Sequence, residues 1–417
     1  MDKFNVLNKN QFGFRPGHST IDALYSCINM INIAKGNKQH TMGIFLDLSK
    51  AFDTVDHTIL LFKLNHYGIR GFTLEWFKSY LSNRSQFTAV GEASSCKSSI
   101  SIGVPQGSIL GPLLFLIYVN DIFSACKNAH LNLFADDTNI FVTENNLTDL
   151  FSSSNTACAE ISEWLKSNRL SVNSSKTSYI LFFPSKNDEA FIEANNLTVF
   201  IGGNTLQRVD FTKFLGVFID EKLTFKHHID YITGKINKVN SMLFKRRDLI
   251  PQHCRRSLYF ALVNSHVQYG LALYGNANHT TIKSLNCAVN KVLRTLQNES
   301  RYCNSKQLYL TYNVLPVNLL FNFTIAKMIF KTINHTDENK PMSQAIKDAF
   351  TVHTTNHSYP TRLSNTNYLY TESNQGFFKS YVFSNILVWN NIPASIRSCN
   401  SLHKFSFLYK NFLYDSW

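Results

Sequence analysis

The chain has 417 residues, of which 44% are hydrophobic, so it can bury a sizeable core and form two or three compact units. It carries 41 Lys and Arg against 28 Asp and Glu, and the formal net charge of +13 favours a polyanionic partner, most commonly nucleic acid. Its eight cysteines include no CxxC pair, which argues against a zinc finger, and we expect reduced thiols in an intracellular protein.

The N-terminal part of the chain mixes predicted helices and strands. Apolar residues from Ile21 to Ile31 recur near helical spacing and predict a helix. The apolar run at 41–48 has polar flanks and predicts a buried strand, and the segment 49–69 then turns into a helix. Residues 98–122 begin as a strand, pass through a Pro-Gln-Gly turn and enter an apolar helix. That helix is broken by Gly and Pro and is shorter than the roughly 20 residues of a membrane span.

Further strand signals follow. The segment 130–142 has two β-prone runs around an Asp-Asp corner and predicts a hairpin. A helix is predicted at roughly 156–168, and short strand-like runs follow at 178–184, 197–203 and 211–220. Because helices and strands do not alternate regularly over this part of the chain, we expect an α+β domain around an antiparallel sheet rather than a doubly wound sheet.

The chain changes character after residue 221. The stretch 222–256 holds nine Lys and Arg against two Asp, a local charge of +7. Apolar residues from Ile232 to Leu243 recur at helical spacing within it, which predicts a helix with a basic outer surface. Most charge runs are solvated surfaces, but this concentration favours contact with phosphates. The candidate contacts are Lys235, Lys238, Lys245, Arg246 and Arg247.

Three aspartates are candidates for a metal site, although each has an ordinary alternative. Asp47 ends a buried strand, where an ionised carboxylate needs compensation, but an Asp that caps the following helix is common. Asp136 and Asp137 lie at a hairpin corner, where Asp is a usual turn residue. Two adjacent carboxylates repel by roughly 4 kcal/mol at about 4 Å with an effective dielectric near 20. Two Mg²⁺ ions roughly 3.5–4 Å apart would relieve that repulsion, with Mn²⁺ as the alternative ion.

Six sequence blocks follow one another in a fixed order. They are QFGFRPGHST (11–20), FLDLSKAFDTVDH (45–57), GVPQGSILGPLLFLIYVND (103–121), FADD (134–137), NRLSVNSSKT (168–177) and FLGVFID (214–220). FADD alone is weak evidence, but the ordered set covers residues 11–220 and resembles the reverse transcriptase domain of non-LTR (LINE-type) retrotransposons, near the jockey, CR1 and L2 groups. The resemblance implies a right-hand polymerase fold and RNA-directed DNA synthesis by two-metal catalysis.

The resemblance also implies catalytic roles for individual residues. Asp47, Asp136 and Asp137 match the family's metal-binding triad, in which the first two would hold both ions and Asp137 would be a less direct ligand. Lys176 matches a lysine proposed to protonate the departing pyrophosphate, and its ordinary alternative is a surface Lys. Phe52 matches a bulky residue that leaves no room for a sugar 2′-hydroxyl; without the resemblance it would be an ordinary core Phe.

Three more residues match substrate-binding positions. Gln106 and Gly107 match a turn that packs near the incoming nucleotide and the template, although a Pro-Gln-Gly sequence suits any tight turn. Arg15 lies in a fingers block that contacts template or triphosphate in the family. The implied partners are an RNA template, a DNA primer or nicked target DNA, and dNTPs, with no membrane. The implied site of action is the nucleus after synthesis in the cytoplasm.

The resemblance divides the chain into partial fingers and palm at 1–221, a basic helical thumb at 222–305 and a helical C-terminal region without an assigned role at 306–417. An endonuclease and an early fingers block would precede residue 11 in full-length elements, so we expect an N-terminally truncated copy. A catalytically inactive, nucleic-acid-binding remnant is therefore the alternative function. A palm-type cyclase is a weaker rival, because a cyclase needs no template groove.

Overall fold

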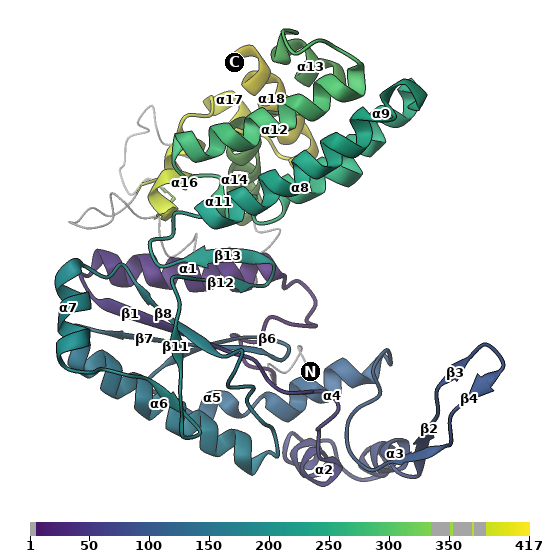
Figure 1. Cartoon of the computed structure of the whole chain (residues 1–417), viewed down its shortest axis with the longest axis vertical. Helices are drawn as coiled ribbons and strands as arrows, with labels where there is room; N and C mark the ends of the chain where they lie inside the picture. Colours follow the sequence, from purple (N-terminus) through teal and green to yellow (C-terminus); the bar gives the residue numbers. More distant parts are fainter. Residues whose placement is uncertain (1–5, 335–350, 353–368, 371–380) are drawn as a thin grey trace, which may run out of the picture. The chain divides into compact units, whose positions relative to one another are not determined.

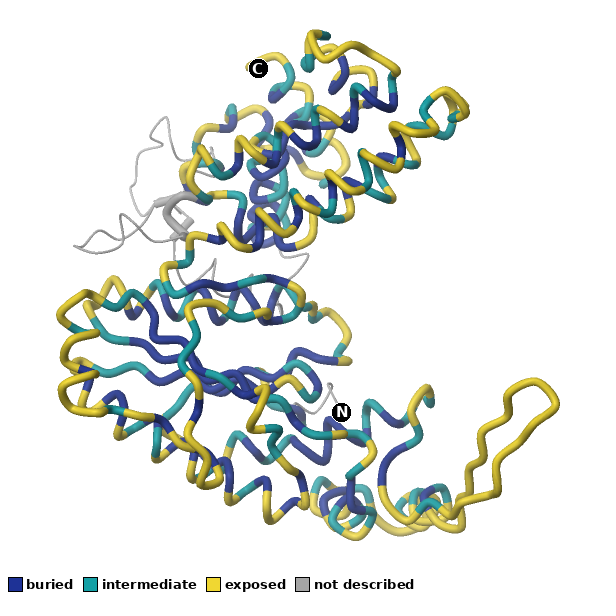
Figure 2. The backbone as a smooth tube through the Cα atoms, viewed as in Figure 1, coloured by how far each residue is buried: buried dark blue, intermediate teal, exposed yellow. Residues whose placement is uncertain are grey.

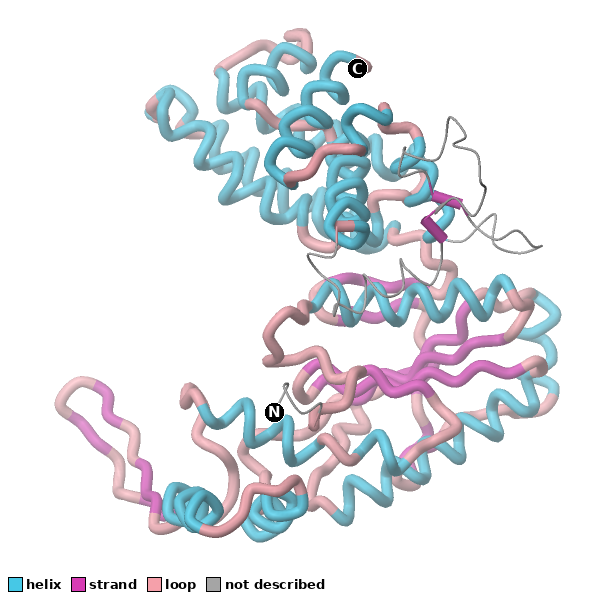
Figure 3. The backbone as a smooth tube through the Cα atoms, turned by 180° about the vertical axis from the view of Figure 1, so that it is seen from behind, coloured by secondary structure: helices cyan, strands magenta, loops and turns pink. Residues whose placement is uncertain are grey.

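The computed structural model describes residues 6–334, 351–352, 369–370 and 381–417. The chain forms two compact units, each described here by itself. The sheet unit consists of Met1–Ala23 and Lys38–Asp210, and the helical unit consists of Leu24–Asn37 and Phe211–Trp417. Figure 3 shows the contrast in content, with long strands in the first unit and mainly helices in the second.

A five-stranded sheet forms the centre of the sheet unit (Figure 1). Its strands are β1 (His40–Leu46), β6 (His130–Phe134), β7 (Asp137–Glu144), β8 (Ser178–Phe182) and β11 (Gln207–Arg208). Their order is β11–β8–β1–β7–β6, and all neighbours are antiparallel except β11 and β8. Strand β1 lies in the middle because six consecutive residues, from Thr41 to Leu46, are buried and suit a strand covered on both faces.

Helices of the sheet unit pack on the sheet and on one another to form its core. Helix α6 (Leu147–Ser167) contacts β1 and β7 through its apolar side. Helix α4 (Leu110–Val119) is almost wholly apolar and therefore becomes buried, packing against α2 (His57–His66). Figure 2 shows that burial is concentrated in the sheet and in the sides of the helices that face inward. The other helices of the unit are α3 (Phe72–Leu81), α5 (Ile122–Ala125) and α7 (Lys186–Ala194).

Short hairpins extend the sheet unit. Between α3 and α4 the chain forms β2 (Arg84–Gln86), β3 (Ala89–Val90), β4 (Ala93–Ser94) and β5 (Ser98–Ile100), in which β2 pairs with β5 and β3 with β4. Figure 2 shows this projecting arm as almost entirely exposed. A second small hairpin joins β9 (Phe200–Ile201) to β10 (Asn204–Thr205).

The helical unit is organised around two long helices, α8 (Lys226–Phe244) and α12 (His279–Gln297), which pack side by side. A hairpin of β12 (Phe211–Phe214) and β13 (Val217–Asp220) precedes α8, and most of α1 (Thr20–Gly36) also belongs to this unit. The remaining elements are α9 (Gln252–Tyr259), α10 (Ser265–Gln268), α11 (Leu271–Tyr274), α13 (Ser305–Tyr312), α14 (Val317–Ile333), α16 (Tyr381–Asn390), α17 (Ala394–Arg397), α18 (Leu402–Asp415), the single turns η2 (Arg247–Leu249) and η3 (Phe260–Asn264), and the strand pair β14 (Thr351–Val352) and β15 (Leu369–Tyr370).

The predicted fold class, an α+β domain with an antiparallel sheet followed by helices, is confirmed. The helix predicted at 156–168 was placed too late: α6 begins at Leu147, where the Asn146 side chain accepts a hydrogen bond from the Asp149 N–H. The boundaries proposed after residues 221 and 305 stay predictions. In the part of the chain that the structure describes, no single helix has the length and apolar content to cross a membrane, and one bent pair, α13 with α14, meets that test by length and composition.

Candidate active site

Strand pairing brings the first candidate aspartate to the hairpin corner. In the antiparallel ladder of β1 and β7 the last pair is Leu46 opposite Thr138, so Asp47, directly after β1, and Asp137, directly before Thr138, both lie at this end of the ladder. Opposed Cα atoms in such ladders lie about 4.5–5.5 Å apart. Two carboxylates that are distant in the sequence therefore lie near each other at the ends of two interior strands, close enough for the charge of Asp47 to contribute to the raised pKa of Asp137. Asp47 does not cap α2, because the side chain that accepts from the first turn of that helix belongs to Asp56.

The third aspartate occupies the corner itself. The β6–β7 ladder closes on the pair Phe134 and Asp137, so the two turn residues are Ala135 and Asp136. The predicted Asp-Asp corner is thus split between the turn and the first residue of β7. Neighbouring protein that displaces water, followed by the charges of Asp136 and Asp47, raises the pKa of Asp137 from 3.8 to about 6, although this residue is still exposed to solvent. The charges of the three carboxylates therefore act on one another, and the neighbouring cation is Lys176, beside Asp47.

A buried glutamine supports this corner. Gln11 is 1% exposed, and its Oε1 accepts hydrogen bonds from the backbone N–H groups of Ala135 (3.0 Å) and Gly13 (2.9 Å). Ala135 has a φ of 58°, a left-handed conformation that is unfavourable for a residue with a side chain. A Cβ on Gly13 would lie 2.3 Å from the Ala135 nitrogen, so only glycine fits there. Gln11 and Gly13 therefore hold the turn that presents Asp136.

The sequence pattern by itself indicated no role for Gln11 or Gly13. A buried Gln has no periodic signature, and its partner lies 124 residues away in the chain. The only available signal was the position of both residues in the block QFGFRPGHST.

Lys176 lies beside Asp47 because its loop is tied to the end of β1. The Asn173 N–H donates to the Asp47 carbonyl oxygen (2.8 Å), and the Asp47 N–H donates to the buried Thr177 hydroxyl (3.3 Å). The Lys176 Nζ is 3.9 Å from Asp47 Oδ2, and its side chain is 69% exposed. An exposed pair at this distance contributes little to stability, so the ammonium is free to move toward a bound anion.

The Phe52 ring is fixed by other aromatic rings. It stacks on Phe115 with centroids 4.4 Å apart and meets Phe14 edge-on at 6.2 Å. The Phe52 carbonyl oxygen accepts a hydrogen bond from the Val104 N–H (2.9 Å), which joins this segment to the loop that carries Gln106. The ring is half-buried, so it packs on the core and also presents a surface to solvent.

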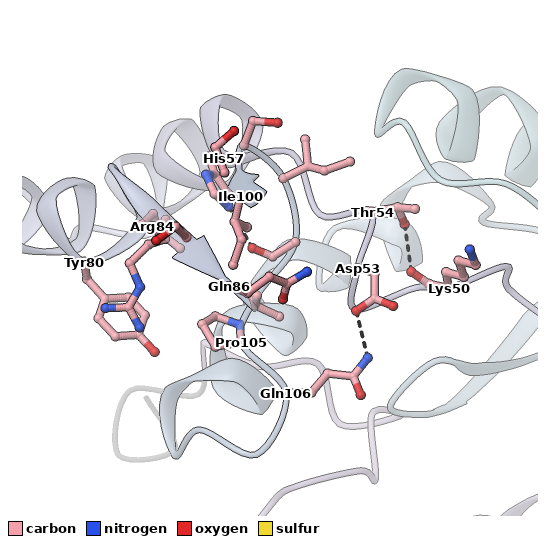
Figure 4. A pocket seen from close by; sticks show the side chains of 17 residues that line it. Lys50, Asp53, Thr54, His57, Tyr80, Arg84, Gln86, Ile100, Pro105 and Gln106 are labelled. Atoms are coloured by element: carbon pink, nitrogen blue, oxygen red, sulfur yellow. Dashed lines mark hydrogen bonds between the residues drawn. The ribbon is translucent and has the colours of Figure 1, made fainter. Parts of the chain in front are cut away.

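The structure also joins Gln106 to the segment that follows Phe52. Its Nε2 donates to Asp53 Oδ1 (2.8 Å), as Figure 4 shows. Gly107 has a φ of +81°, and a Cβ added there would meet no atom of the described residues within 4 Å, so the turn needs glycine for its backbone and not for space. Arg15 closes its own loop, because its Nη1 donates to the carbonyl oxygens of Asn8 (2.7 Å) and Gln11 (3.2 Å).

The five basic candidates lie in the helical unit, from the middle of α8 to just beyond its end. Lys238, Lys245 and Arg246 are exposed. Lys235 and Arg247 are half-buried, because the Lys235 Nζ lies 4.6 Å from the centre of the Tyr231 ring and the Arg247 guanidinium lies 4.3 Å from that of Phe244. The first three cations are therefore the most accessible to a phosphate.

The carboxylates suit a metal ion by donor type but do not yet surround one. Within the described ranges, no three His, Cys, Asp or Glu side chains are grouped so that they could hold a metal ion. Carboxylate oxygens are the ligands that hard divalent cations prefer. The pKa of Asp137 is raised mainly by burial and further by the charges of Asp136 and Asp47, and a cation would offset those charges. The side chains of Asp47, Asp136 and Asp137 must therefore turn toward a shared ion for the site to close.

Comparisons with known proteins identify the family of the chain. The family model described as reverse transcriptase (RNA-dependent DNA polymerase) matches residues 1–219. A probable RNA-directed DNA polymerase from transposon X-element of Drosophila melanogaster is 28% identical over 309 residues, covering 71% of this chain and 32% of that protein. The RNA-directed DNA polymerase from mobile element jockey of the same species is 27% identical over 320 residues, covering 74% and 34%.

Among solved structures, telomerase from Candida albicans in complex with a TWJ fragment of telomeric RNA matches with a TM-score of 0.40 and 10% identity, covering 76% of this chain and 57% of that one. The chain spans about a third of the length of the curated relatives named above. The family match extends over more than half of the chain and includes every candidate residue of the sheet unit. The chain therefore belongs to the reverse transcriptase (RNA-dependent DNA polymerase) family, in the group found in non-LTR retrotransposons.

Proposed function

We propose that this chain is an RNA-directed DNA polymerase that forms phosphodiester bonds from dNTPs. The observation that carries the proposal is the pairing of β1 with β7, which ends next to Asp47 and Asp137 and brings Asp47 near the hairpin corner. Reverse transcriptases as a class use divalent metal ions, and a group of carboxylates at the ends of the interior strands of a rigid sheet suits such ions. Family membership supports the reaction type.

The finer part of the proposal concerns the ions and their ligands. Asp47 and Asp136 hold two Mg²⁺ ions, and Asp137 is a less direct ligand; Mn²⁺ is the alternative ion. Two bound ions supply activation of a primer 3′-hydroxyl and stabilisation of the departing pyrophosphate. Lys176 donates a proton to that pyrophosphate, and its exposed ammonium, tethered next to Asp47, supports this role.

Substrate selection follows from the aromatic and amide side chains. Phe52 excludes the 2′-hydroxyl of a ribonucleotide. Its stacking on Phe115 supports this steric role, because a ring packed in this way cannot move aside for the hydroxyl. Gln106 and Gly107 pack near the incoming nucleotide and the template, and Arg15 contacts template or triphosphate.

The proposed partners are an RNA template and a DNA primer supplied by nicked target DNA, with dNTPs as substrates and the nucleus as the place of action. The formal charge of +13 supports a nucleic-acid partner. Lys235, Lys238, Lys245, Arg246 and Arg247 contact the phosphates of the template–primer, and the exposure of Lys238, Lys245 and Arg246 supports this.

A primer-extension assay on poly(rA)/oligo(dT) with Mg²⁺ tests the function. The variant with Asp136→Asn and Asp137→Asn should lose at least about a thousandfold in rate, because metal stabilisation of the transition state amounts to several kcal/mol. Its affinity for the template–primer should stay within about twofold of that of the unchanged chain. Glu163→Gln with Glu193→Gln removes two exposed carboxylates elsewhere in the sheet unit and should leave the rate unchanged. Full extension by the Asn variant would show that the metal site lies elsewhere.

A catalytically inactive, nucleic-acid-binding remnant is the second candidate function. The open arrangement of the three carboxylates favours it, since within the described residues no ready metal-binding group exists. This alternative predicts that the unchanged chain binds the template–primer but extends no primer in either Mg²⁺ or Mn²⁺. Extension in either ion eliminates it.

A further inference from the structure

A large open pocket lies beside the candidate active site, at the base of the exposed arm. It has a volume of about 860 Å³ and is bounded by the end of α3, by β2 and β5, and by the loops at 50–57 and 101–106 (Figure 4). Gln106 and Asp53 line the pocket on its side toward Phe52 and are hydrogen-bonded to each other. The roles proposed above use Gln106 but leave the rest of this pocket without a ligand.

The floor of the pocket is rigidly joined to the segment that contains Phe52. The Gly103 N–H donates to the Val55 carbonyl oxygen (2.7 Å), and a ring nitrogen of His57 hydrogen-bonds to the Gly103 carbonyl oxygen (2.7 Å). Asp56 and Ile102 form an isolated antiparallel bridge next to these contacts. A ligand in this pocket would therefore be held at a fixed position relative to the Phe52 segment.

One wall continues into a stack of planar groups. Trp76 and Tyr80, one turn apart on α3, stack with centroids 5.6 Å apart and an interplanar angle of 10°. The Arg84 guanidinium lies over the Tyr80 ring at 5.5 Å. Aromatic residues at helical spacing usually face a core, but Trp76 is 48% exposed and Arg84 is exposed. Tyr80 and Arg84 therefore line the pocket, and the stack of flat groups continues beyond it to the exposed Trp76.

The charge and polarity of the lining suit a nucleotide. Lys50 and Arg84 supply two positive charges, against one carboxylate, Asp53, that already accepts from Gln106. Apolar residues line other parts of the wall, and hydroxyl and amide groups suitable for base edges lie among them. These polar groups belong to Thr54, Ser85, Gln86, Ser99 and Ser101. Flat aromatic and guanidinium surfaces combined with cations are the usual means of binding unpaired bases and their phosphates.

We propose that this pocket binds an unpaired nucleotide of the template strand, with the base against the Tyr80–Arg84 stack and its phosphate near Lys50. The proposal rests on the proposed function, because it takes the single strand to be the template ahead of the primer terminus. A template strand is favoured over a free nucleotide because the stack extends outside the pocket to Trp76 and offers surface for a second base.

Fluorescence anisotropy with the full chain tests the proposal. The probes are an RNA–DNA hybrid with a 5′ RNA overhang of about five nucleotides, a blunt hybrid of equal duplex length, and the overhang hybrid with abasic overhang positions. The unchanged chain should bind the overhang about tenfold more tightly than the blunt or abasic hybrid, because stacking of one base contributes about this much. Tyr80→Leu and Arg84→Gln should each lose most of that advantage while the affinity for the blunt hybrid stays within about twofold.

Lys97→Gln is the matched control, because Lys97 is an exposed cation on the same arm that does not line the pocket. It should keep the overhang advantage, and thermal unfolding of all three variants should match that of the unchanged chain. An absent overhang advantage, or an advantage that survives both Tyr80→Leu and Arg84→Gln, overturns the proposal. Primer extension measured on the same preparations separates the two hypotheses: extension without an overhang advantage refutes only the pocket. An overhang advantage without extension refutes only the polymerase activity.

Discussion

The sheet unit and the helical unit place their candidate residues by different physical means. In the sheet unit, Asp47 and Asp137 meet because β1 and β7 pair in one register, and a shift by one residue would turn each side chain to the opposite face. In the helical unit, cations such as Lys238 and Arg246 lie on an exposed surface, where a cation at a neighbouring position would attract phosphate almost equally well. Metal ligands need fixed geometry and therefore a rigid sheet, whereas phosphate attraction needs only local charge.

The largest effect should come from the buried support of the corner. Gln11→Leu introduces an apolar side chain of similar size, which leaves the backbone N–H groups of Gly13 and Ala135 without their hydrogen-bond acceptor. Each unsatisfied buried N–H costs about 1–3 kcal/mol, so we expect a loss of about 3 kcal/mol in the free energy of unfolding. Urea denaturation measures this loss.

Gln39→Leu serves as the control for that substitution, because Gln39 makes one long side-chain contact, 3.4 Å from Asn145, at the surface. It should change the free energy of unfolding by less than about 0.5 kcal/mol. Equal stabilities of the Gln11 and Gln39 variants would show that the corner does not depend on this hydrogen bonding.

Charge removal in the helical unit should have an intermediate effect, on binding only. Lys238→Gln with Arg246→Gln removes two exposed cations, so the slope of log affinity for template–primer against log salt should fall by up to about 1.8. Affinity at low salt should fall about tenfold, with stability unchanged. Lys283→Gln with Lys404→Gln removes two exposed cations elsewhere in the unit. An equal loss from both pairs would mean that total charge, and not the α8 surface, determines binding.

Titration of Asp137 should have a smaller effect on stability. Because its pKa in the fold is raised to about 6, the folded chain binds this proton more tightly, and the contribution of Asp137 to stability falls as pH rises from about 4 to about 6. A pKa difference of about two between the folded and unfolded chain corresponds to a loss of nearly 3 kcal/mol in the free energy of unfolding. Solvent screening of this exposed group reduces the expected loss to about 1 kcal/mol. With EDTA present, Asp137→Asn should therefore be more stable than the unchanged chain at pH 7.5 and not at pH 4. A constant difference across this range would show that the carboxyl is not destabilised.

The smallest effect on stability should come from Lys176. Its ion pair with Asp47 is long and exposed, so Lys176→Gln should change the free energy of unfolding by less than about 0.5 kcal/mol. If the ammonium protonates pyrophosphate, the rate of primer extension should fall by about a hundredfold or more. Lys186→Gln, at an exposed position on α7, is the control. An unchanged rate for Lys176→Gln would show that Lys176 is a surface lysine without a catalytic role.

Sequence patterns predicted those features that depend on local signals. The strand that ends just before Asp47 and the hairpin at Asp136 followed from apolar runs and turn residues. The start of α6 was misplaced because its first nine residues, LTDLFSSSN, contain three apolar residues and a run of serines, which weakens the apolar periodicity. The role of Gln11 could not be predicted, because a buried hydrogen bond between residues far apart depends on tertiary packing.

Binding of Mn²⁺ to the full chain, followed by electron paramagnetic resonance, tests whether strand register creates the metal site. We expect binding that Mg²⁺ displaces and that Asp47→Asn and Asp136→Asn each weaken by about tenfold or more, whereas Glu163→Gln has no effect. Unchanged Mn²⁺ affinity in the Asp47→Asn variant would show that the end of β1 and the hairpin corner do not share an ion, which would contradict a metal site built by strand pairing.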